Sequence, residues 1–553
     1  MRLLPILVFF SVCVMQCGAV QIVEFCPDPY LLNDEDEYLV LAGNGLLDGI
    51  TISDANGGFR FPPKTPINGS LSVARNGLAF EKTHRTPPDF EWVDSSPAVP
   101  NVISANTLRM ANAKDSLLLY DNGRLIQKVE WPNDVKPREG QVHYLEEGIW
   151  DRRVLMLGQS RLLPATFSGI TVTTFVSPDC SYEVFSSAVL SASHELRVNV
   201  YEFTSTNLST IITDARKRGV DVDVLVEGGP VGGVTAEEKT VIWAMNASGI
   251  PIYQMAAPTG GHAPYRYDHA KYLVIDQNAV LLTSENFGYT GFPPPGISGN
   301  RGWGVYLESP EVAGYFTGVY ESDISGNAIR PVTGTSGAVE TIPPVPHSVE
   351  FSPERFYNAT VSPVISPDTS DQITHLIDSA QTSIEIEQMY ITNESATELN
   401  PFLAAAINAS RRGVTVQVLL DSYWYNVEDT KDNDEMVALI NMIARTEHLP
   451  LEARCADLKA SGIEKIHNKG VIVDDERVLV SSINWNSNSP NFNREAGVII
   501  DHPGVARYFH AVFLDDWAPA VRAQEKPVDY VKIAAVIGVI VVLLVLYYRR
   551  HIR

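Results

Sequence analysis

The feature that most constrains the fold of this chain is an internal duplication. A strand-like run, an amphipathic helix pattern and a further strand occur in the same order at about residues 168–330 and again at 347–520. Strands that alternate with helices are typical of βαβ units and of an α/β sheet. The sequence between the copies, 331–346, is rich in Pro, Gly and Thr, as linkers are. We therefore expect two α/β lobes of one fold, joined by a linker.

Each copy carries the same set of polar residues at the same spacing. A lysine follows a histidine by two positions, and an aspartate, a serine and an asparagine follow that histidine by seven, fifteen and seventeen positions. Residues two apart on a strand point to one face of a sheet, so each histidine and its lysine should lie side by side. The first set is His269, Lys271, Asp276, Ser284 and Asn286, and the second is His467, Lys469, Asp474, Ser482 and Asn484.

Two such faces turned toward each other suit the chemistry of a phosphodiester. Ammonium, hydroxyl and carboxamide groups can bind the phosphate oxygens. One imidazole can attack phosphorus while the other protonates the leaving oxygen. A single His-x-Lys would be read more simply as an exposed strand, but the matched offsets of two copies favour a shared site. We expect this chemistry to need no metal or other cofactor, and we expect Asp276 and Asp474 to brace the strands rather than react.

The paired motifs are the signature of the phospholipase D superfamily, which residues 165–520 resemble. The resemblance implies a phosphodiesterase that forms a covalent phosphohistidine, often on the histidine of the first lobe. It also implies a carboxylate near position 495 that orients the histidine of its own lobe. Glu495 fits this pattern, whereas the first copy has Gly302 at the corresponding place, with Glu202 as a possible substitute. We therefore expect Glu495 to pair with His467, the general acid, and His269 to attack.

The segment before the lobes, about 20–132, has the short strands and turn residues of a β-sandwich. One hairpin is expected at Ser116–Val129, around the turn Asp121-Asn122-Gly123. The run Asp36–Leu41 and the later hairpin make this segment resemble a lamin-tail domain, an immunoglobulin-like module. Such modules bind or space other domains, so no catalytic residue is expected here. Residues 133–167 are expected to connect the sandwich to the first lobe.

Both ends of the chain carry apolar segments. Residues 1–19 have the charged start, apolar run and small-residue end of a secretory signal peptide. Residues 530–548 are almost uncharged and would span about 28 Å as a helix, close to the thickness of a bilayer core. The arginines of the tail 549–553 indicate that this end is cytoplasmic. We expect a single-pass cell-membrane protein whose body lies outside the cytoplasm.

The sequence leaves the substrate open between several classes. Phospholipid is favoured because the expected anchor holds the lobes beside a membrane, and either hydrolysis or phosphatidyl transfer is possible. A nuclease acting on single-stranded nucleic acid is an alternative, although the net charge of −24 argues against a duplex DNA binder. A catalytically inactive surface binding protein is a third. No stable protein partner is expected. The aromatics Tyr423, Trp424, Tyr425 and Trp485 either line the substrate entrance or are core or loop residues.

Overall fold

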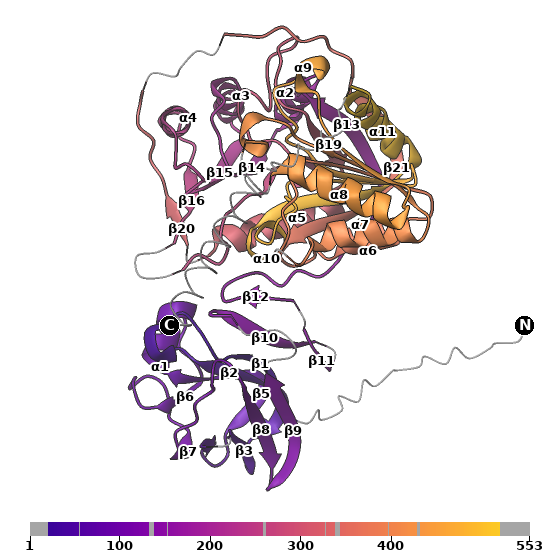
Figure 1. Cartoon of the computed structure of the whole chain (residues 1–553). Coiled ribbons are helices and arrows are strands. Elements are labelled where there is room, and N and C mark those ends of the chain that lie inside the picture. The colour runs from indigo at the N-terminus through magenta and orange to yellow at the C-terminus, as the bar shows by residue number, and fades with distance from the viewer. Residues whose placement is uncertain are drawn as a thin grey trace, which may run out of the picture.

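The computed structural model describes residues 20–519 except 55, 132–137, 147, 152, 258–261, 327, 338–342, 396 and 429–431. In this range the chain forms a β-rich N-terminal domain, at the bottom of Figure 1, and a larger α/β body above it. The expected signal peptide and the expected membrane-spanning segment lie outside the described residues. Within them, no helix is both long enough and apolar enough to cross a bilayer.

The N-terminal domain is built from two sheets that face each other. One sheet has the strand order β11-β10-β1-β2-β5-β6, with β12 also pairing with β10, and the other has the order β7-β4-β3-β8-β9. Alternate residues of both sheets, such as Leu39, Ile52 and Phe59, fill one hydrophobic core. The expected β-rich domain is therefore present, and the hairpin predicted at Ser116–Val129 is formed by β8 and β9.

The elements of this domain are β1 (Gln21–Cys26), β2 (Tyr38–Leu46), β3 (Ile50–Ser53), β4 (Gly58–Arg60), β5 (Pro66–Asn76), α1 (Gly77–His84), β6 (Phe90–Val93), β7 (Ile103–Asn106), β8 (Asp115–Asp121), β9 (Arg124–Trp131), β10 (Gln141–Glu146), β11 (Ile149–Trp150) and β12 (Leu155–Met156). The last three fall in the segment expected to be a connector. They belong to the sandwich because β10 pairs with β1 and buries Val142 and Tyr144.

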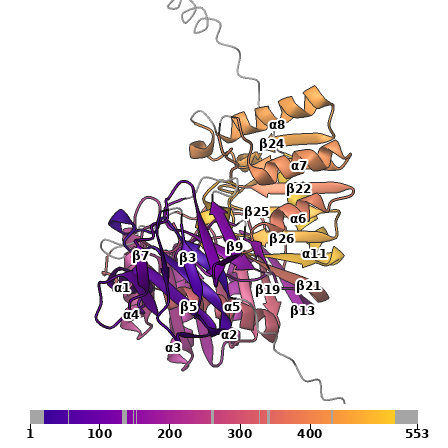
Figure 2. The same cartoon turned by 90° about the horizontal axis from the view of Figure 1, so that it is seen from below.

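The duplicated region forms one continuous sheet rather than two separate ones. Its strand order is β20-β16-β15-β14-β17-β18-β19-β13-β21-β27-β26-β25-β22-β23-β24. Apart from the edge strand β20, the order on one side of the β13–β21 pair repeats on the other side. The two copies therefore meet through the antiparallel pair β13–β21, and Figure 2 shows β13, β19 and β21 beside one another where the lobes join.

Lobe 1 contains β13 (Phe167–Ser177), α2 (Ser181–Ser191), β14 (Glu195–Val200), α3 (Thr206–Lys217), β15 (Asp221–Glu227), α4 (Ala236–Ala247), β16 (Ile252–Met255), β17 (Lys271–Ile275), β18 (Ala279–Thr283), β19 (Gly302–Glu308), α5 (Pro310–Ile324) and β20 (Ile329–Pro331). Lobe 2 contains β21 (Glu354–Ser366), α6 (Gln372–Asp378), β22 (Ser383–Gln388), α7 (Pro401–Arg411), β23 (Thr415–Leu420), α8 (Asn433–Glu447), β24 (Leu451–Cys455), α9 (Leu458–Ser461), β25 (Lys469–Val473), β26 (Arg477–Ser481), α10 (Ser489–Phe492), β27 (Glu495–Asp501) and α11 (Pro503–Trp517).

Two buried arginines, one from each copy, connect the lobes. Arg301 of lobe 1 forms ion pairs with Asp179 at 2.8 Å and with Asp516 of lobe 2 at 2.7 Å. Arg494 of lobe 2 pairs with Asp368 at 3.1 Å and with Asp323 of lobe 1 at 2.9 Å. A buried charge must be paired to be tolerated, so each arginine fixes the position of the opposite lobe.

Candidate active site

The two catalytic histidines expected from the sequence lie where the lobes cross. His269 and His467 lie two residues before the first residues of β17 and β25 and are held by the backbone of the opposite lobe. The His269 amide donates to the carbonyl of Arg494, and the His467 amide donates to the carbonyl of Arg301, both at 2.8 Å. The two arginines that connect the lobes therefore also hold the backbone of the histidines. Arg494 holds His269, and Arg301 holds His467.

Each histidine is accompanied by its motif lysine, as the spacing predicts. Lys271 and Lys469 are completely buried, and each ammonium donates to the carbonyl of its own histidine at 2.5 Å. Burial lowers the pKa of Lys271 to about 8 and that of Lys469 well below its usual value. Lys271 contributes to the lowered pKa of Lys469, so the two ammonium groups lie close together and a bound anionic group would stabilise both.

Glu495 contacts the histidine of the other lobe. Its carboxylate lies 2.8 Å from Nδ1 of His269, and it also accepts hydrogen bonds from Ser482 at 2.6 Å and Asn493 at 3.0 Å. The expectation that Glu495 orients His467 is wrong. The parallel pairing of Asp268 with Arg494 brings the segment before Glu495 against the segment before His269, so the carboxylate reaches across the interface.

His467 has a carboxylate partner as well, and it is Glu285 of lobe 1. Its Oε1 lies 3.3 Å from Nδ1 of His467, within ion-pair distance although not in hydrogen-bond geometry. Asn300 donates to the second oxygen of Glu285 at 2.9 Å, just as Asn493 donates to Glu495. The sequence analysis missed Glu285, although it stands between the motif residues Ser284 and Asn286.

The absence of a side chain at Gly302 makes room for Glu285. A Cβ atom placed on Gly302 would lie 2.3 Å from Oε1 and 2.5 Å from Cγ of Glu285. The carboxylate of lobe 1 therefore comes from Glu285 rather than from position 302, and it occupies the space beside Gly302 at the start of β19. Glu202, the other candidate, instead accepts a hydrogen bond from Asn286 at 2.8 Å.

The two imidazoles differ from free histidine in their proton affinity. Burial lowers the pKa of His269 to about 4, although Glu495 opposes the shift. Burial and the neighbouring Lys469 hold the pKa of His467 well below its usual value. Burial also raises the pKa of Glu285 to about 7, whereas His269 and Lys271 outweigh burial and lower the pKa of Glu495. At neutral pH His269 is therefore neutral beside an ionised carboxylate, which can accept its Nδ1–H and leave Nε2 free to attack.

The remaining motif residues support this arrangement. The Ser284 and Ser482 hydroxyls accept hydrogen bonds from the backbone of Trp303 and Ala496, which ties each motif to its neighbouring strand. Asn286 is half-buried and Asn484 is buried. Asp276 and Asp474 lie at the far ends of β17 and β25, where each accepts several backbone hydrogen bonds from the segment before β14 or β22.

Two further residues border the histidines. The ring of Tyr201 lies 4.6 Å from the His269 ring and 5.3 Å from the Lys271 ammonium. Lys465, two residues before His467, donates to the Tyr425 hydroxyl at 3.1 Å. Both lie on extended segments that end at the site. Lys465 could have been predicted from the sequence, because residues two apart on a strand point to the same side and Lys465 is two residues before His467.

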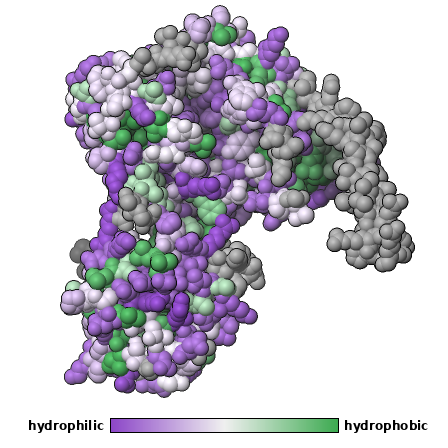
Figure 3. Space-filling model, turned by 60° about the vertical axis from the view of Figure 1, so that its left-hand side comes forward, coloured by the Kyte–Doolittle hydropathy of each residue, from purple (hydrophilic) through white to green (hydrophobic). Residues whose placement is uncertain are grey.

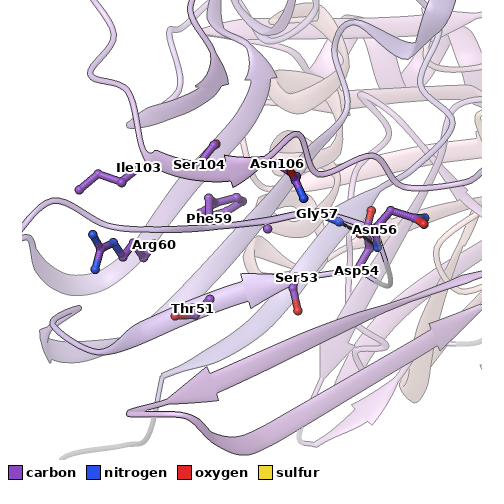
Figure 4. Close-up of a pocket in the computed structure, with 11 residues that line it drawn as sticks. Thr51, Ser53, Asp54, Asn56, Gly57, Phe59, Arg60, Ile103, Ser104 and Asn106 are labelled. Atoms are coloured by element: carbon purple, nitrogen blue, oxygen red, sulfur yellow. Dashed lines mark hydrogen bonds between the residues drawn. The ribbon is translucent and has the colours of Figure 1, made fainter.

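Other features of the described residues lie away from the two histidines. A hollow of about 570 Å³ on the sandwich is lined by β3, β4 and β7 residues such as Thr51, Arg60 and Asn106 (Figure 4). Glu385, Asp475 and His510 are the one group of described residues whose donor atoms lie close enough together to hold a metal ion, and His510 already contacts both carboxylates. Neither feature includes a residue of the duplicated motif.

The sequence of the lobes matches a known family. The model of the "Cardiolipin synthase, PLD-like domain" family matches residues 186–324 and 373–517, which together make up just over half of the chain. The protein therefore belongs to the phospholipase D-like family, as the paired motifs predict. The comparison with curated proteins finds no match.

Solved structures resemble the chain at low identity. Phosphatidylserine synthase of Haemophilus influenzae is 13% identical, with a TM-score of 0.48, and the match covers 63% of this chain and 86% of that one. Nuc of Salmonella typhimurium, a phospholipase D family member, is 23% identical, with a TM-score of 0.25 over 31% of this chain and all of that one. Polyphosphate kinase of Porphyromonas gingivalis is 13% identical, with a TM-score of 0.41 over 65% and 53% of the two chains.

Proposed function

We propose that the protein is a phosphodiesterase of the phospholipase D type that works through a covalent phosphohistidine on His269. The observation that carries this proposal is the reciprocal pairing of the histidines with carboxylates. Glu495 of lobe 2 supports His269 of lobe 1, and Glu285 of lobe 1 supports His467 of lobe 2. A surface protein that had lost its activity would have no need to keep two buried lysines and two buried carboxylates around these imidazoles.

In the first step the substrate phosphate binds between Lys271 and Lys469. Nε2 of His269 attacks phosphorus, and the P–N bond forms as the bond to the leaving oxygen breaks. Glu495 accepts the Nδ1–H of His269 and stabilises the positive charge that develops on the ring. The phosphate charge favours a protonated His467, which donates its proton to the leaving oxygen.

In the second step His467 is neutral and acts as a general base. It removes a proton from a water molecule, or from an alcohol in a transfer reaction, whose oxygen attacks phosphorus. The P–N bond breaks, the electron pair returns to Nε2 of His269, and the product phosphate leaves. The imidazole and ammonium groups supply the nucleophile, the acid and the charge stabilisation, so the proposed cycle requires no metal ion.

The substrate we favour from the sequence is phospholipid, reached by a body tethered outside the membrane through 530–548. Family membership supports a phosphodiester substrate, and a nuclease activity on single-stranded nucleic acid is the second candidate. The exposed aromatic residues Trp424 and Tyr425 beside the site favour this second candidate.

Trapping of the covalent intermediate tests the proposed chemistry. With a labelled diester that has a good leaving group, His269→Ala should give no labelled protein because the attacking nitrogen is gone. His467→Ala should still become labelled, because a good leaving group needs little protonation, and the label should persist because no base activates water. The opposite pattern would reverse the two roles, and labelling of neither variant nor wild type would reject the mechanism.

A further inference from the structure

The two lobes present corresponding loops beside their histidines. These loops follow β15 and β23, and each begins with a buried carboxylate, Glu227 or Asp421. Glu227 accepts a hydrogen bond from the amide of Asp268 at 2.6 Å, and Asp421 accepts one from the amide of Ile466 at 2.7 Å. Because Asp268 and Ile466 immediately precede the histidines, both loops are anchored next to the reacting centre.

The loops differ in the side chains that they present. In lobe 1 the loop is the glycine-rich run 228–233, in which Val231 is the one large exposed side chain. In lobe 2 the same place holds Tyr423, Trp424 and Tyr425. Asp421 also accepts the amide of Tyr423 at 3.0 Å, which fixes the start of this aromatic loop. The site is therefore flanked by exposed backbone on one side and by aromatic rings on the other.

The rings of this aromatic loop are exposed and lie close together. Trp424 has 60% of its surface exposed and Tyr425 has 36%. The Tyr425 ring centre lies 4.9 Å from that of Tyr423 and 5.5 Å from that of Trp424. Large exposed aromatic side chains on a loop that is anchored at its start offer flat apolar surface, which is typical of a binding site.

A lysine connects the aromatic loop to the catalytic residues. Lys465 and His467 are two apart in an extended segment, so their side chains point to the same side. The Lys465 ammonium donates to the Tyr425 hydroxyl at 3.1 Å and lies 5.7 Å from the centre of its ring. An ammonium has three donors, so it can also bind an anion. The corresponding residue of lobe 1 is Tyr267, so this third lysine occurs on the lobe 2 side alone.

We infer that Trp424, Tyr425 and Lys465 form a subsite for the nucleotide next to the scissile phosphate of a single-stranded nucleic acid. The base would stack on the aromatic rings and the neighbouring phosphate would bind Lys465. This inference rests on the proposed phosphodiesterase and selects its substrate class. Stacking on aromatic rings combined with a cation for the backbone is how proteins hold single strands without reading their sequence. An acyl chain would use the rings but would gain nothing from the lysine beside them.

Binding of a fluorescent oligothymidylate to the full chain tests the subsite separately from turnover. The measurement is made by anisotropy on a His269→Ala background, so that the oligonucleotide is not consumed. Loss of one stacking residue should weaken binding about tenfold or more, so Trp424→Ala should raise Kd by that factor. The matched control is Trp243→Ala, which removes another exposed tryptophan, 45% exposed on α4 of lobe 1, and should not change Kd.

Lys465→Gln provides a second readout that a loss of folding would not imitate. It should weaken binding at low salt and reduce the slope of log Kd against log salt by about 0.7, the value for one phosphate contact on a single strand. Equal Kd values for Trp424→Ala and Trp243→Ala, with an unchanged salt slope for Lys465→Gln, would overturn the subsite.

Two further outcomes separate the possible failures. If Trp424→Ala weakens binding to vesicles of anionic phospholipid and leaves oligonucleotide binding unchanged, the loop contacts a membrane and the nucleotide subsite is rejected. If the oligonucleotide depends on Trp424 but the wild-type protein does not cleave it, the subsite stands and the proposed function fails.

Discussion

Moving the carboxylate of lobe 1 back to the position that it has in lobe 2 should preserve its function. Lobe 2 has Ile483 and Glu495 where lobe 1 has Glu285 and Gly302. The double variant Glu285→Ile, Gly302→Glu gives lobe 1 the lobe 2 arrangement. Gly302 does not have the left-handed backbone that only glycine tolerates. Asn300 could then donate to the new carboxylate as Asn493 does to Glu495.

The two single variants indicate how much kcat and stability should change. Glu285→Ile removes the carboxylate 3.3 Å from His467. An opposite charge at this distance stabilises an imidazolium by about 1.4–3 kcal/mol, so kcat should fall by about 10–100-fold. Gly302→Glu alone places a Cβ atom 2.3 Å from the Glu285 carboxylate. Overpacking of this kind costs about 1–3 kcal/mol, so this variant should be less stable than wild type.

The assay compares kcat for two small diesters, one with a good and one with a poor leaving group. In the proposed mechanism His467 donates the proton to the leaving oxygen, so Glu285→Ile should affect the poor leaving group more strongly. The double variant should recover to within about tenfold of wild type. A folded double variant that is no more active than Glu285→Ile would refute the equivalence of the two carboxylates. Glu285→Gln, which keeps the shape of the side chain, replaces Glu285→Ile if that variant does not fold.

Three further outcomes are expected. The value of kcat/KM should rise as the pH passes about 4, because His269 loses its proton there, and fall as the pH passes about 7, because the Glu285–His467 pair loses the proton that it shares. A profile that still rises above pH 8 would contradict these roles. Arg301→Met should reduce the free energy of unfolding in urea by about 3–5 kcal/mol because it removes the arginine partner of two buried carboxylates. Arg355→Met, at an exposed pair with Glu308, should cost at most about 1 kcal/mol. Turnover should survive dialysis against a chelator, and a loss that added Zn²⁺ or Mg²⁺ restores would contradict the proposed chemistry.

Local pattern was sufficient to predict the strands of the site. The apolar runs after Lys271 and Lys469 predict buried strands, and β17 and β25 are buried at every position. The turn Asp121-Asn122-Gly123 predicts a hairpin because Asn and Gly tolerate positive φ, and both adopt it. In these cases the information lies within a few residues of the element that it determines.

Contacts between the lobes could not be predicted in this way. The spacing of Glu495 from His467 relates residues of one copy, whereas the contact that Glu495 makes is with the other copy. For Trp485 the sequence left two interpretations open, as a residue of the substrate entrance or of the core or a loop. It is completely buried and packs against Phe402, so the interpretation as a core residue is correct. Only Trp424 and Tyr425 of the four aromatics are exposed to any large extent.

The two lobes differ in sequence but place the same groups, a lysine and a carboxylate, around each histidine. Glu495 lies on the first residue of β27, whereas Glu285 lies after β18, yet each places a carboxylate beside the Nδ1 atom of the opposite histidine. Adjacent strands of a sheet bring both chain positions to the same place, so the acid can move between them if the vacated position becomes small. Gly302 meets this condition. The two lobes therefore share a carboxyl group beside Nδ1 of each imidazole, and the position of this group in the sequence is free to change.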